Sequence, residues 1–143
     1  MRLRPATADD LDGIDAVFAR ARDAMFTYLH RLHTPEEDRQ FLAGLLETTE
    51  VWVAEEGGRV AGFAALAEEL LEHIYAFPHG RGVGSALLER AKELRPSGFR
   101  LWVFQRNEGA RRLYERHGMR LVRLTDGAGN EQGEPDAMYE WRP

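Results

Sequence analysis

Residues 79–85 read His79-Gly80-Arg81-Gly82-Val83-Gly84-Ser85 and lie between a predicted strand at 70–77 and a predicted helix that ends at 95–98. Apolar residues at helical spacing, followed by Arg-Pro-Ser-Gly, indicate that helix. The glycines allow the main chain to turn tightly and leave amide hydrogens unshielded, while the helix adds its positive end. A pyrophosphate fits such a site, and Arg81 could add a charge-assisted contact. The glycines could equally make only a tight connection between the two elements.

The remaining pattern predicts one α+β domain over residues 1–143, because a chain of this length holds a single hydrophobic core. Thr34-Pro35-Glu36-Glu37 is a helix start signal, with Pro at the first helical position and Glu three residues after the cap. We expect a mixed, mostly antiparallel central sheet flanked by helices. The expected elements are helices at 7–25 and 34–47, strands at 51–55, 60–66 and 70–77, the helix after the glycine-rich loop, a strand at 99–104, a helix from Asn107 to Gly118, and strands at 119–125 and 137–141.

The composition argues against several kinds of site and partner. The chain has no cysteine, which removes disulfides, thiolate metal sites and cysteine nucleophiles. His30 and His33 alone make a poor metal site, so we expect no metal. A net charge of -5 argues against nucleic acid, and the lack of a signal peptide or long apolar run predicts a cytoplasmic protein without a membrane partner. The loop has neither the Walker nor the G-x-G-x-x-G pattern, which disfavours a nucleoside triphosphatase and a dinucleotide dehydrogenase.

A second motif follows the strand at 99–104 and reads Asn107-Glu108-Gly109-Ala110-Arg111-Arg112-Leu113-Tyr114-Glu115-Arg116-His117-Gly118-Met119. It is similar to the Asn-x-x-Ala-x-x-Leu-Tyr-x-x-x-Gly-Phe element of the GNAT superfamily of acetyl-CoA-dependent N-acetyltransferases. Residues 74–88 resemble the acetyl-CoA signature of that family, Gln/Arg-x-x-Gly-x-Gly/Ala, with His79 at the Gln/Arg position and a slightly shorter connection after Pro78. The resemblance in element order extends from about Leu3 to Trp141.

This resemblance implies an enzyme that moves acetyl from acetyl-CoA to a primary amine by direct transfer in a ternary complex. It implies that Tyr114 is the general acid that protonates the coenzyme A sulfur, a task that suits a phenol of pKa about 10 only close to that sulfur. Asn107 lies about two helical turns before Tyr114 and caps the helix, and it can also line the coenzyme channel. The residues implied to bind acetyl-CoA are Ile74, Tyr75, Ala76, His79, Gly80, Arg81, Gly82, Val83, Gly84, Ser85 and Asn107.

Neither motif fixes the general base. Glu72 is the preferred candidate because it lies two residues before Ile74, and its carboxylate could remove the amine proton through a water. Strict alternation along the strand would place Glu72 on the face of Ile74 and Ala76, and His73 on the face of Tyr75. His73 is the second candidate because imidazole titrates near neutral pH. Loss of the proton directly to bulk water is the third possibility.

Acceptor specificity is expected to come from residues 25–37 and 126–136, whose sequences carry no readable code. The acidic residues of the second segment could favour a cationic substrate. Trp52, Trp102 and Trp141 lie on predicted strands and are expected to pack in the core or on the surface of the sheet.

Three further points stay open at this level. Arg111, Arg112 and Arg116 form a basic helix face that could meet phosphates or only be solvated. An exposed edge strand near the carboxyl terminus could pair with a second copy and give a homodimer. The alternative function is a non-catalytic acyl-CoA-binding or sensor module on the same fold, which would bind the coenzyme without turnover.

Overall fold

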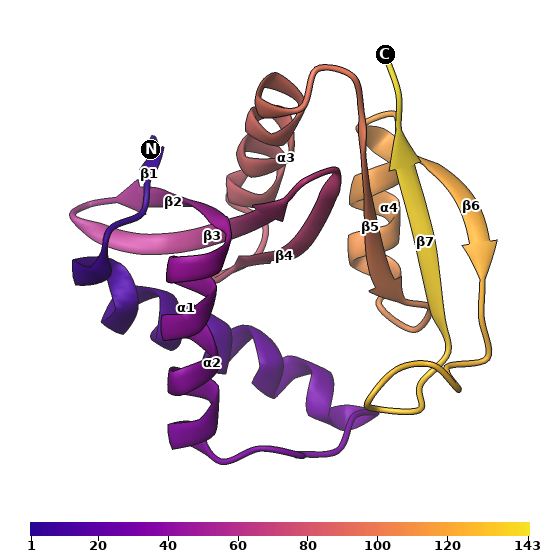
Figure 1. Ribbon diagram of the computed structural model, residues 1–143, viewed down its shortest axis with the longest axis horizontal. Coiled ribbons are helices and arrows are strands. Elements are labelled where there is room, and N and C mark those ends of the chain that lie inside the picture. The colour runs from indigo at the N-terminus through magenta and orange to yellow at the C-terminus, as the bar shows by residue number, and fades with distance from the viewer.

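The centre of the fold is a seven-stranded sheet with the strand order β1-β2-β3-β4-β5-β7-β6 (Figure 1). This computed structural model describes residues 1–143, with all side chains except those of residues 26 and 27. All neighbouring strands are antiparallel except β4 and β5, so the expected mixed-sheet α+β fold is confirmed. The elements are β1 (Arg2–Pro5), η1 (Ala8–Asp10), α1 (Leu11–Asp23), η2 (Ala24–Thr27), α2 (Pro35–Thr48), β2 (Glu50–Glu56), β3 (Arg59–Ala67), β4 (Leu70–Ala76), α3 (Val83–Leu94), β5 (Phe99–Phe104), α4 (Glu108–Arg116), β6 (Arg120–Leu124) and β7 (Asp136–Trp141).

Local hydrogen bonds set the starts of η1 and α2. The Thr34 hydroxyl accepts from the Glu37 amide at 3.1 Å, and the Thr34 amide donates to the Glu37 carboxylate at 2.8 Å. The Thr7 amide likewise donates to Asp10 at 2.8 Å. The Arg4 guanidinium donates twice to the same carboxylate, also at 2.8 Å, and lowers the pKa of Asp10. A buried aspartate is thus stabilised by an ion pair and by the chain that enters α1.

The sheet buries an apolar cluster on each face. One cluster packs against α1 and α2 and includes Phe18, Leu42 and Phe63, which are at most 3% exposed. The other packs against α3 and α4 and includes Leu88 and Tyr139, which are fully buried. The two helical layers therefore lie on opposite faces of the sheet.

The two parallel strands in the middle of the sheet separate soon after they begin. Only Leu70 of β4 pairs with Arg100 of β5, next to a hydrogen bond of 2.9 Å from the Arg100 amide to the Glu69 carbonyl. Figure 1 shows β4 and β5 diverging beyond this point. Regular parallel strands hydrogen-bond along their whole length, so the divergence leaves backbone groups on their facing edges without strand partners.

One strand was not expected from the sequence. β1 contains Arg2, Arg4 and Pro5 in four residues and has no apolar alternation, yet it pairs with β2 along its whole length. An edge strand tolerates proline because one side needs no hydrogen-bond donor. No helix in the described part of the chain is long and apolar enough to cross a bilayer.

Candidate active site

Two cavities open at the gap between β4 and β5. The first, here called the loop cavity, has a volume of about 770 Å³ and lies against the glycine-rich loop and the starts of α3 and α4. The second, here called the strand cavity, has a volume of about 650 Å³ and lies against β4, β5 and the segment between β6 and β7. Both volumes are typical of small-molecule sites. The residues that line both cavities are Met25, Ile74, Tyr75, Asn107 and Tyr114.

The loop cavity gathers all the residues of the glycine-rich loop. Gly80 and Gly82 have φ angles of +83° and +77°, a backbone region that favours glycine. Gly82 caps α3, so the amides of residues 83–85 have no acceptor within the helix. A Cβ at Gly80 or Gly82 would meet only open space, so these glycines keep the cavity wall free of side chains. The loop can therefore present several backbone donors to an anion.

Arginine side chains add positive charge to the same cavity. Arg81, Arg112 and Arg116 line it, and within the described part of the chain none of them forms an ion pair. Arg106 also lines it but pairs with Glu134 at 2.9 Å. Arg111 turns away and donates to the Tyr139 hydroxyl at 3.1 Å. The basic face expected on α4 is thus divided between the cavity and the core.

A chain of hydrogen bonds between α3 and α4 holds the Ser85 hydroxyl. His117 Nε2 lies 2.9 Å from Ser85 Oγ, and His117 Nδ1 lies 2.7 Å from the Glu89 carboxylate. Lys92 and His117 together lower the pKa of Glu89. Because an ionised carboxylate only accepts, Nδ1 carries the hydrogen, and in a neutral imidazole Nε2 accepts from Ser85. Nothing in the sequence pattern pointed to His117 or Glu89 as partners of this residue.

The central part of β4 offers backbone groups to the gap. The Phe77 amide donates to the Ala61 carbonyl at 3.0 Å on the β3 side. Backbone groups alternate sides along an antiparallel pair, so Tyr75 also bonds to β3, while the amides of Ile74 and Ala76 point away from it. The Tyr75 ring packs against Phe63 in the cluster under α1, at a centroid distance of 5.6 Å. Ile74 and Ala76 therefore face the gap through their main chain, and Tyr75 supports the strand from behind.

Tyr114 stands where the two cavities meet. Asn107 begins α4 by accepting from the Ala110 amide at 3.3 Å, which confirms its expected role as helix cap. Tyr114 is 5% exposed, and its ring lies 6.0 Å from that of Tyr139. No described residue hydrogen-bonds its hydroxyl, and burial raises the pKa of Tyr114. The site thus contains a phenol that retains its proton at neutral pH and borders both cavities.

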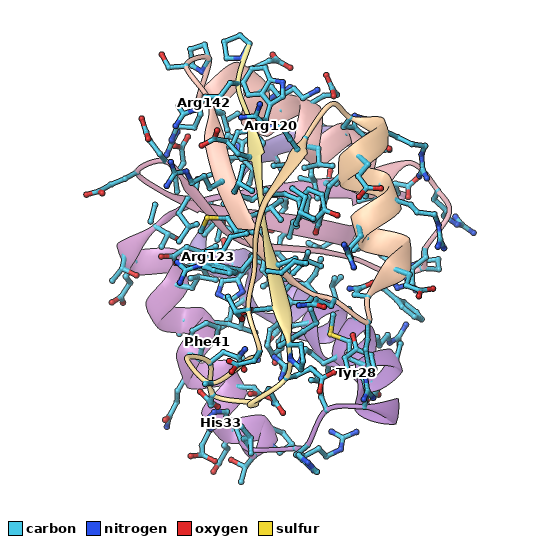
Figure 2. All side chains as sticks on the ribbon, turned by 90° about the vertical axis from the view of Figure 1, so that its right-hand side faces the viewer. Tyr28, His33, Phe41, Arg120, Arg123 and Arg142 are labelled. Carbon is cyan, nitrogen blue, oxygen red and sulfur yellow. The ribbon has the colours of Figure 1, made fainter. Side chains whose placement is uncertain are left out.

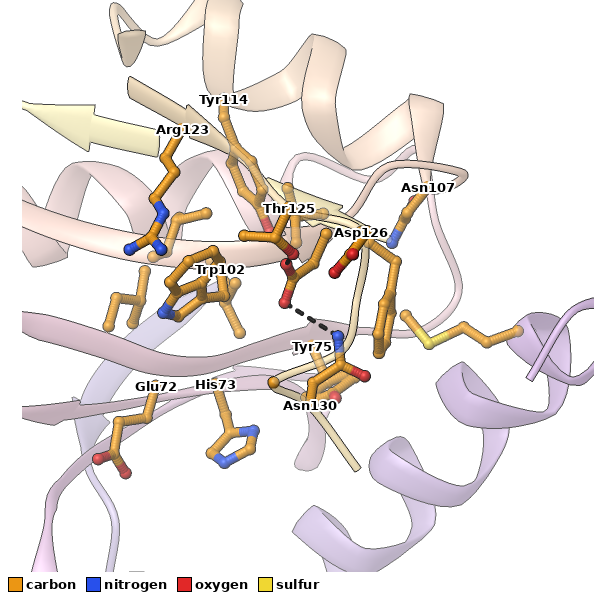
Figure 3. A pocket seen from close by; sticks show the side chains of 18 residues that line it. Glu72, His73, Tyr75, Trp102, Asn107, Tyr114, Arg123, Thr125, Asp126 and Asn130 are labelled. Atoms are coloured by element: carbon orange, nitrogen blue, oxygen red, sulfur yellow. Dashed lines mark hydrogen bonds between the residues drawn. The ribbon is translucent and has the colours of Figure 1, made fainter. Parts of the chain in front are cut away.

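Glu72 and His73 lie on the wall of the strand cavity, but Glu72 is not on the face that strict alternation assigned it. A β-bulge interrupts the pairing with β3, because Ala65 pairs with His73 while the next residue, Leu66, pairs with Leu71. Glu72 is the extra residue, and Figure 3 shows its side chain leaving β4 toward the same side as that of His73. A bulge turns side chains in this way, so the assignment of Glu72 to the face of Ile74 was wrong.

The two candidate bases differ in environment. Glu72 is exposed, and its carboxylate makes no hydrogen bond or ion pair to a described residue. His73 lies 5.3 Å from the Phe41 ring and stacks on Tyr75 at 6.1 Å. Burial, aided by the charge of Arg22, lowers the pKa of His73 to about 4. His73 is therefore a neutral imidazole at physiological pH.

Sequence reasoning missed much of the strand cavity. Trp102 was expected in the core or on the sheet surface. It lies on the surface, is 41% exposed and lines the cavity with Arg123 (Figure 3), a role that was not expected. The signal was available, because alternation in β5 puts Trp102 opposite the buried Leu101 and Val103. The Asp136 carboxylate accepts from the Thr125 hydroxyl and, at 3.2 Å, from Asn130. Asp126, from the segment between β6 and β7, also lines the cavity.

Two loops meet beside the strand cavity. The Gln132 side chain accepts from the His30 amide at 3.1 Å and donates to the His30 carbonyl at 3.0 Å. His33 contacts Glu131, and Figure 2 places His33 beside the segment between β6 and β7. Both segments that were expected to set acceptor specificity therefore lie together, and Met25, Asp126, Gly129 and Asn130 from them line the cavity.

The comparisons with known proteins agree with this geometry. A family model described as "Acetyltransferase (GNAT) domain" matches residues 47–120, more than half of the chain. The chain belongs to the GNAT acetyltransferase family. This GNAT chain is 28% identical to the "Putative phosphinothricin acetyltransferase YwnH" of Bacillus subtilis, over 94% of this chain and 93% of that protein. It is 31% identical to the "Peptidyl-lysine N-acetyltransferase YiaC" of Escherichia coli, over 54% of each chain.

A solved structure shows the same fold with a ligand. The putative acetyltransferase yncA of Salmonella typhimurium, solved "with its cofactor Acetyl-CoA", has a TM-score of 0.74 and 21% identity, covering 99% of this chain and 93% of that one. The family resemblance on residues 74–88 and 107–119 is thereby confirmed at the level of family and fold.

Among the described residues of this GNAT chain, no group of three or more His, Cys, Asp or Glu could hold a metal ion.

Proposed function

We propose that this GNAT acetyltransferase moves the acetyl group of acetyl-CoA to a primary amine within a direct ternary complex. The observation that carries the proposal is the meeting of the two cavities at Tyr114. The loop cavity offers backbone amides and arginines, which suit phosphates, and the strand cavity offers carboxylates, which suit an amine. Each substrate would enter its own cavity, and the two would meet at a buried phenol.

The loop cavity is our proposed site for acetyl-CoA. The amides of residues 83–85 and the Arg81 guanidinium would bind the pyrophosphate, with His79, Gly80 and Gly82 shaping the wall. The free amides of Ile74 and Ala76 would bind the pantetheine arm and the acetyl carbonyl. Bound there, acetyl-CoA supplies an activated acetyl group as a thioester. The Salmonella structure of the same fold, solved with acetyl-CoA, supports acetyl-CoA as the ligand.

The chemistry requires one bond to form and one to break. The neutral amine attacks the acetyl carbon, a C–N bond forms, and the C–S bond breaks. The backbone amides facing the gap would stabilise the negative charge that develops on the acetyl oxygen. Tyr114 would give its phenolic proton to the departing sulfur and regain a proton from solvent. Burial raises the pKa of Tyr114, so the phenol carries its proton at neutral pH before transfer.

Glu72 is our proposed general base. It lines the strand cavity and its exposed carboxylate can pass the amine proton to water. His73 has lost the advantage of titrating near neutral pH, because its pKa is about 4. Replacing Glu72 by Gln should lower turnover more than replacing His73 by Gln.

The proposal is tested by mixing the protein with acetyl-CoA and a panel of amines, amino acids and peptides. We expect one acetylated product, detected by mass, for each coenzyme A thiol released. A rise in melting temperature with acetyl-CoA but no thiol release with any acceptor would indicate a non-catalytic acyl-CoA-binding module instead. No rise at saturating acetyl-CoA would contradict the cofactor site itself.

A further inference from the structure

The strand cavity contains charges of both signs. Glu72, Asp126 and Asp136 contribute carboxylates, and Arg123 is the only arginine or lysine among the described residues that line it. Asp136 is already held by Thr125 and Asn130. No described residue forms an ion pair or hydrogen bond with the Arg123 guanidinium. A cation that borders a cavity and lacks a partner is suited to bind an anionic group of a ligand.

A β-bulge directs Arg123 toward this cavity. Leu121 pairs with Tyr139 of β7, and Arg123 pairs with the very next residue, Met138, so Val122 is the extra residue. Paired side chains share a face, and Met138 also pairs with Trp102 of β5. Arg123 and Trp102 therefore lie on the same face of the sheet. Without the bulge, Arg123 would pair with Ala137 and turn toward the face that α4 covers.

Figure 3 shows Arg123 apart from Asp126, with Glu72 on the same side of the view as Arg123. Arg123 lies beside Trp102 at one end of the view, and Asp126 and Asn130 lie nearer to Asn107 at the other. An acceptor that satisfies both ends carries a cationic amine and an acid group in one molecule. The carboxylates alone would attract any amine. Arg123 is therefore the group that would distinguish amines with an acid group from amines without one.

The volume of the strand cavity suits a small acceptor. Gln132 is bonded to both backbone groups of His30, and His33 contacts Glu131, so residues 30–33 and 131–132 are joined beside the cavity. A peptide chain presenting a lysine needs an open trough along the surface. A free small molecule needs only the cavity volume of about 650 Å³.

From these observations we infer that the acceptor is a small free amino acid or a similar amine with an acid group, and that Arg123 binds this acid group. The inference rests on the proposed acetyl transfer and adds the substrate class to it. The acid group would lie toward Arg123 and Trp102, and the amine toward Tyr114 and the end of the cavity that holds Asp126.

The test compares matched acceptors: amino acids against their primary amides, and a lysine peptide with both ends blocked. The amine of an amino acid amide is less basic than the amine of the free amino acid, so a larger fraction of the amide is neutral at the assay pH. A difference in amine basicity therefore cannot create a preference for the free amino acid. We expect kcat/KM to be about tenfold or more higher for the acids, because hydrogen bonds to charged groups are stronger than neutral ones.

Variants locate this preference at Arg123. Arg123→Gln should raise the KM of the acids about tenfold or more, with little change in kcat, in the KM of the amides or in the KM of acetyl-CoA. Arg123→Lys should restore part of the loss, because it retains the charge. Arg120→Gln is the matched control, since Arg120 lies on the same strand, is exposed and reaches Glu140 only at 3.8 Å (Figure 2).

Three results would overturn the inference alone: equal turnover of acids and amides, an equal loss for both in Arg123→Gln, or a higher kcat/KM for the blocked lysine peptide than for any amino acid. In each case acetyl transfer itself would still be observed. No turnover with any acceptor would contradict the proposed function and this inference together.

Discussion

Tyr114→Phe tests the proposed chemistry with the smallest structural change. The ring stays in place, 6.0 Å from Tyr139, and the lost hydroxyl has no hydrogen-bond partner among the described residues. We therefore expect the free energy of unfolding to change by less than about 1 kcal/mol. Loss of a general acid lowers the rate by about 10²- to 10⁴-fold, which corresponds to about 3 to 5 kcal/mol of transition-state stabilisation. The expected effect is on kcat, with acetyl-CoA binding unchanged.

Tyr139→Phe is the matched control. Its hydroxyl donates to Glu115 at 2.6 Å and accepts from Arg111, so its loss should cost about 1 kcal/mol of stability without slowing turnover. The assay measures thiol release under saturating acetyl-CoA, together with urea unfolding of each variant. Equal turnover in the wild type and Tyr114→Phe would refute Tyr114 as the acid. Equal losses in both variants would show that the effect comes from packing.

Three further predictions concern stability and ligand binding. The pKa of His73 in the folded state is about 4, below its usual value. The free energy of unfolding should therefore fall by about 2 kcal/mol from about pH 7 to about pH 5, because the unfolded chain takes up a proton at His73 in this range. Urea unfolding of His73→Gln should lose this difference between the two pH values. Gly62→Ala should destabilise the fold by about 1–3 kcal/mol, because the added Cβ would lie 2.8 Å from the Tyr75 carbonyl oxygen. Gly44→Ala should instead stabilise α2, because its Cβ would have nothing within 4 Å. Thermal melting of the two variants compares these effects. Gly82→Ala and Gly58→Ala share a φ of +77° and should each cost about 1 kcal/mol of stability, but only Gly82→Ala should weaken acetyl-CoA binding in calorimetry.

The parts of the fold with strong local signals could be predicted from the sequence. The Thr34 cap, the Asn107 cap and the glycine-rich loop act through neighbours within a few residues, and the structure has each of them where it was expected. The two motifs also allowed the family to be predicted, because their residues form the glycine-rich loop and the helix α4, which border the same cavity. Pro5 and the arginines of β1 concealed a strand that only pairing with β2 reveals.

The strand cavity could not be predicted in the same way, because its two bulges depend on partner strands. The bulge at Glu72 is set by the register with β3, and the bulge before Arg123 by the register with β7. A one-residue shift moves a side chain to the other face, and neither strand shows this in its own sequence. The candidate base and the acceptor-side arginine therefore became assignable to a face only from the structure.

Acetyl-CoA is proposed to bind in the gap where β4 leaves β5, against the free edge of β4. Amide hydrogen exchange, measured by NMR with and without coenzyme A, tests this residue by residue. We predict that the amides of Ile74 and Ala76 become protected only when coenzyme A is added, whereas the amide of Tyr75, bonded to β3, is protected in both states. Unchanged exchange at Ile74 and Ala76 under saturating coenzyme A would contradict the claim.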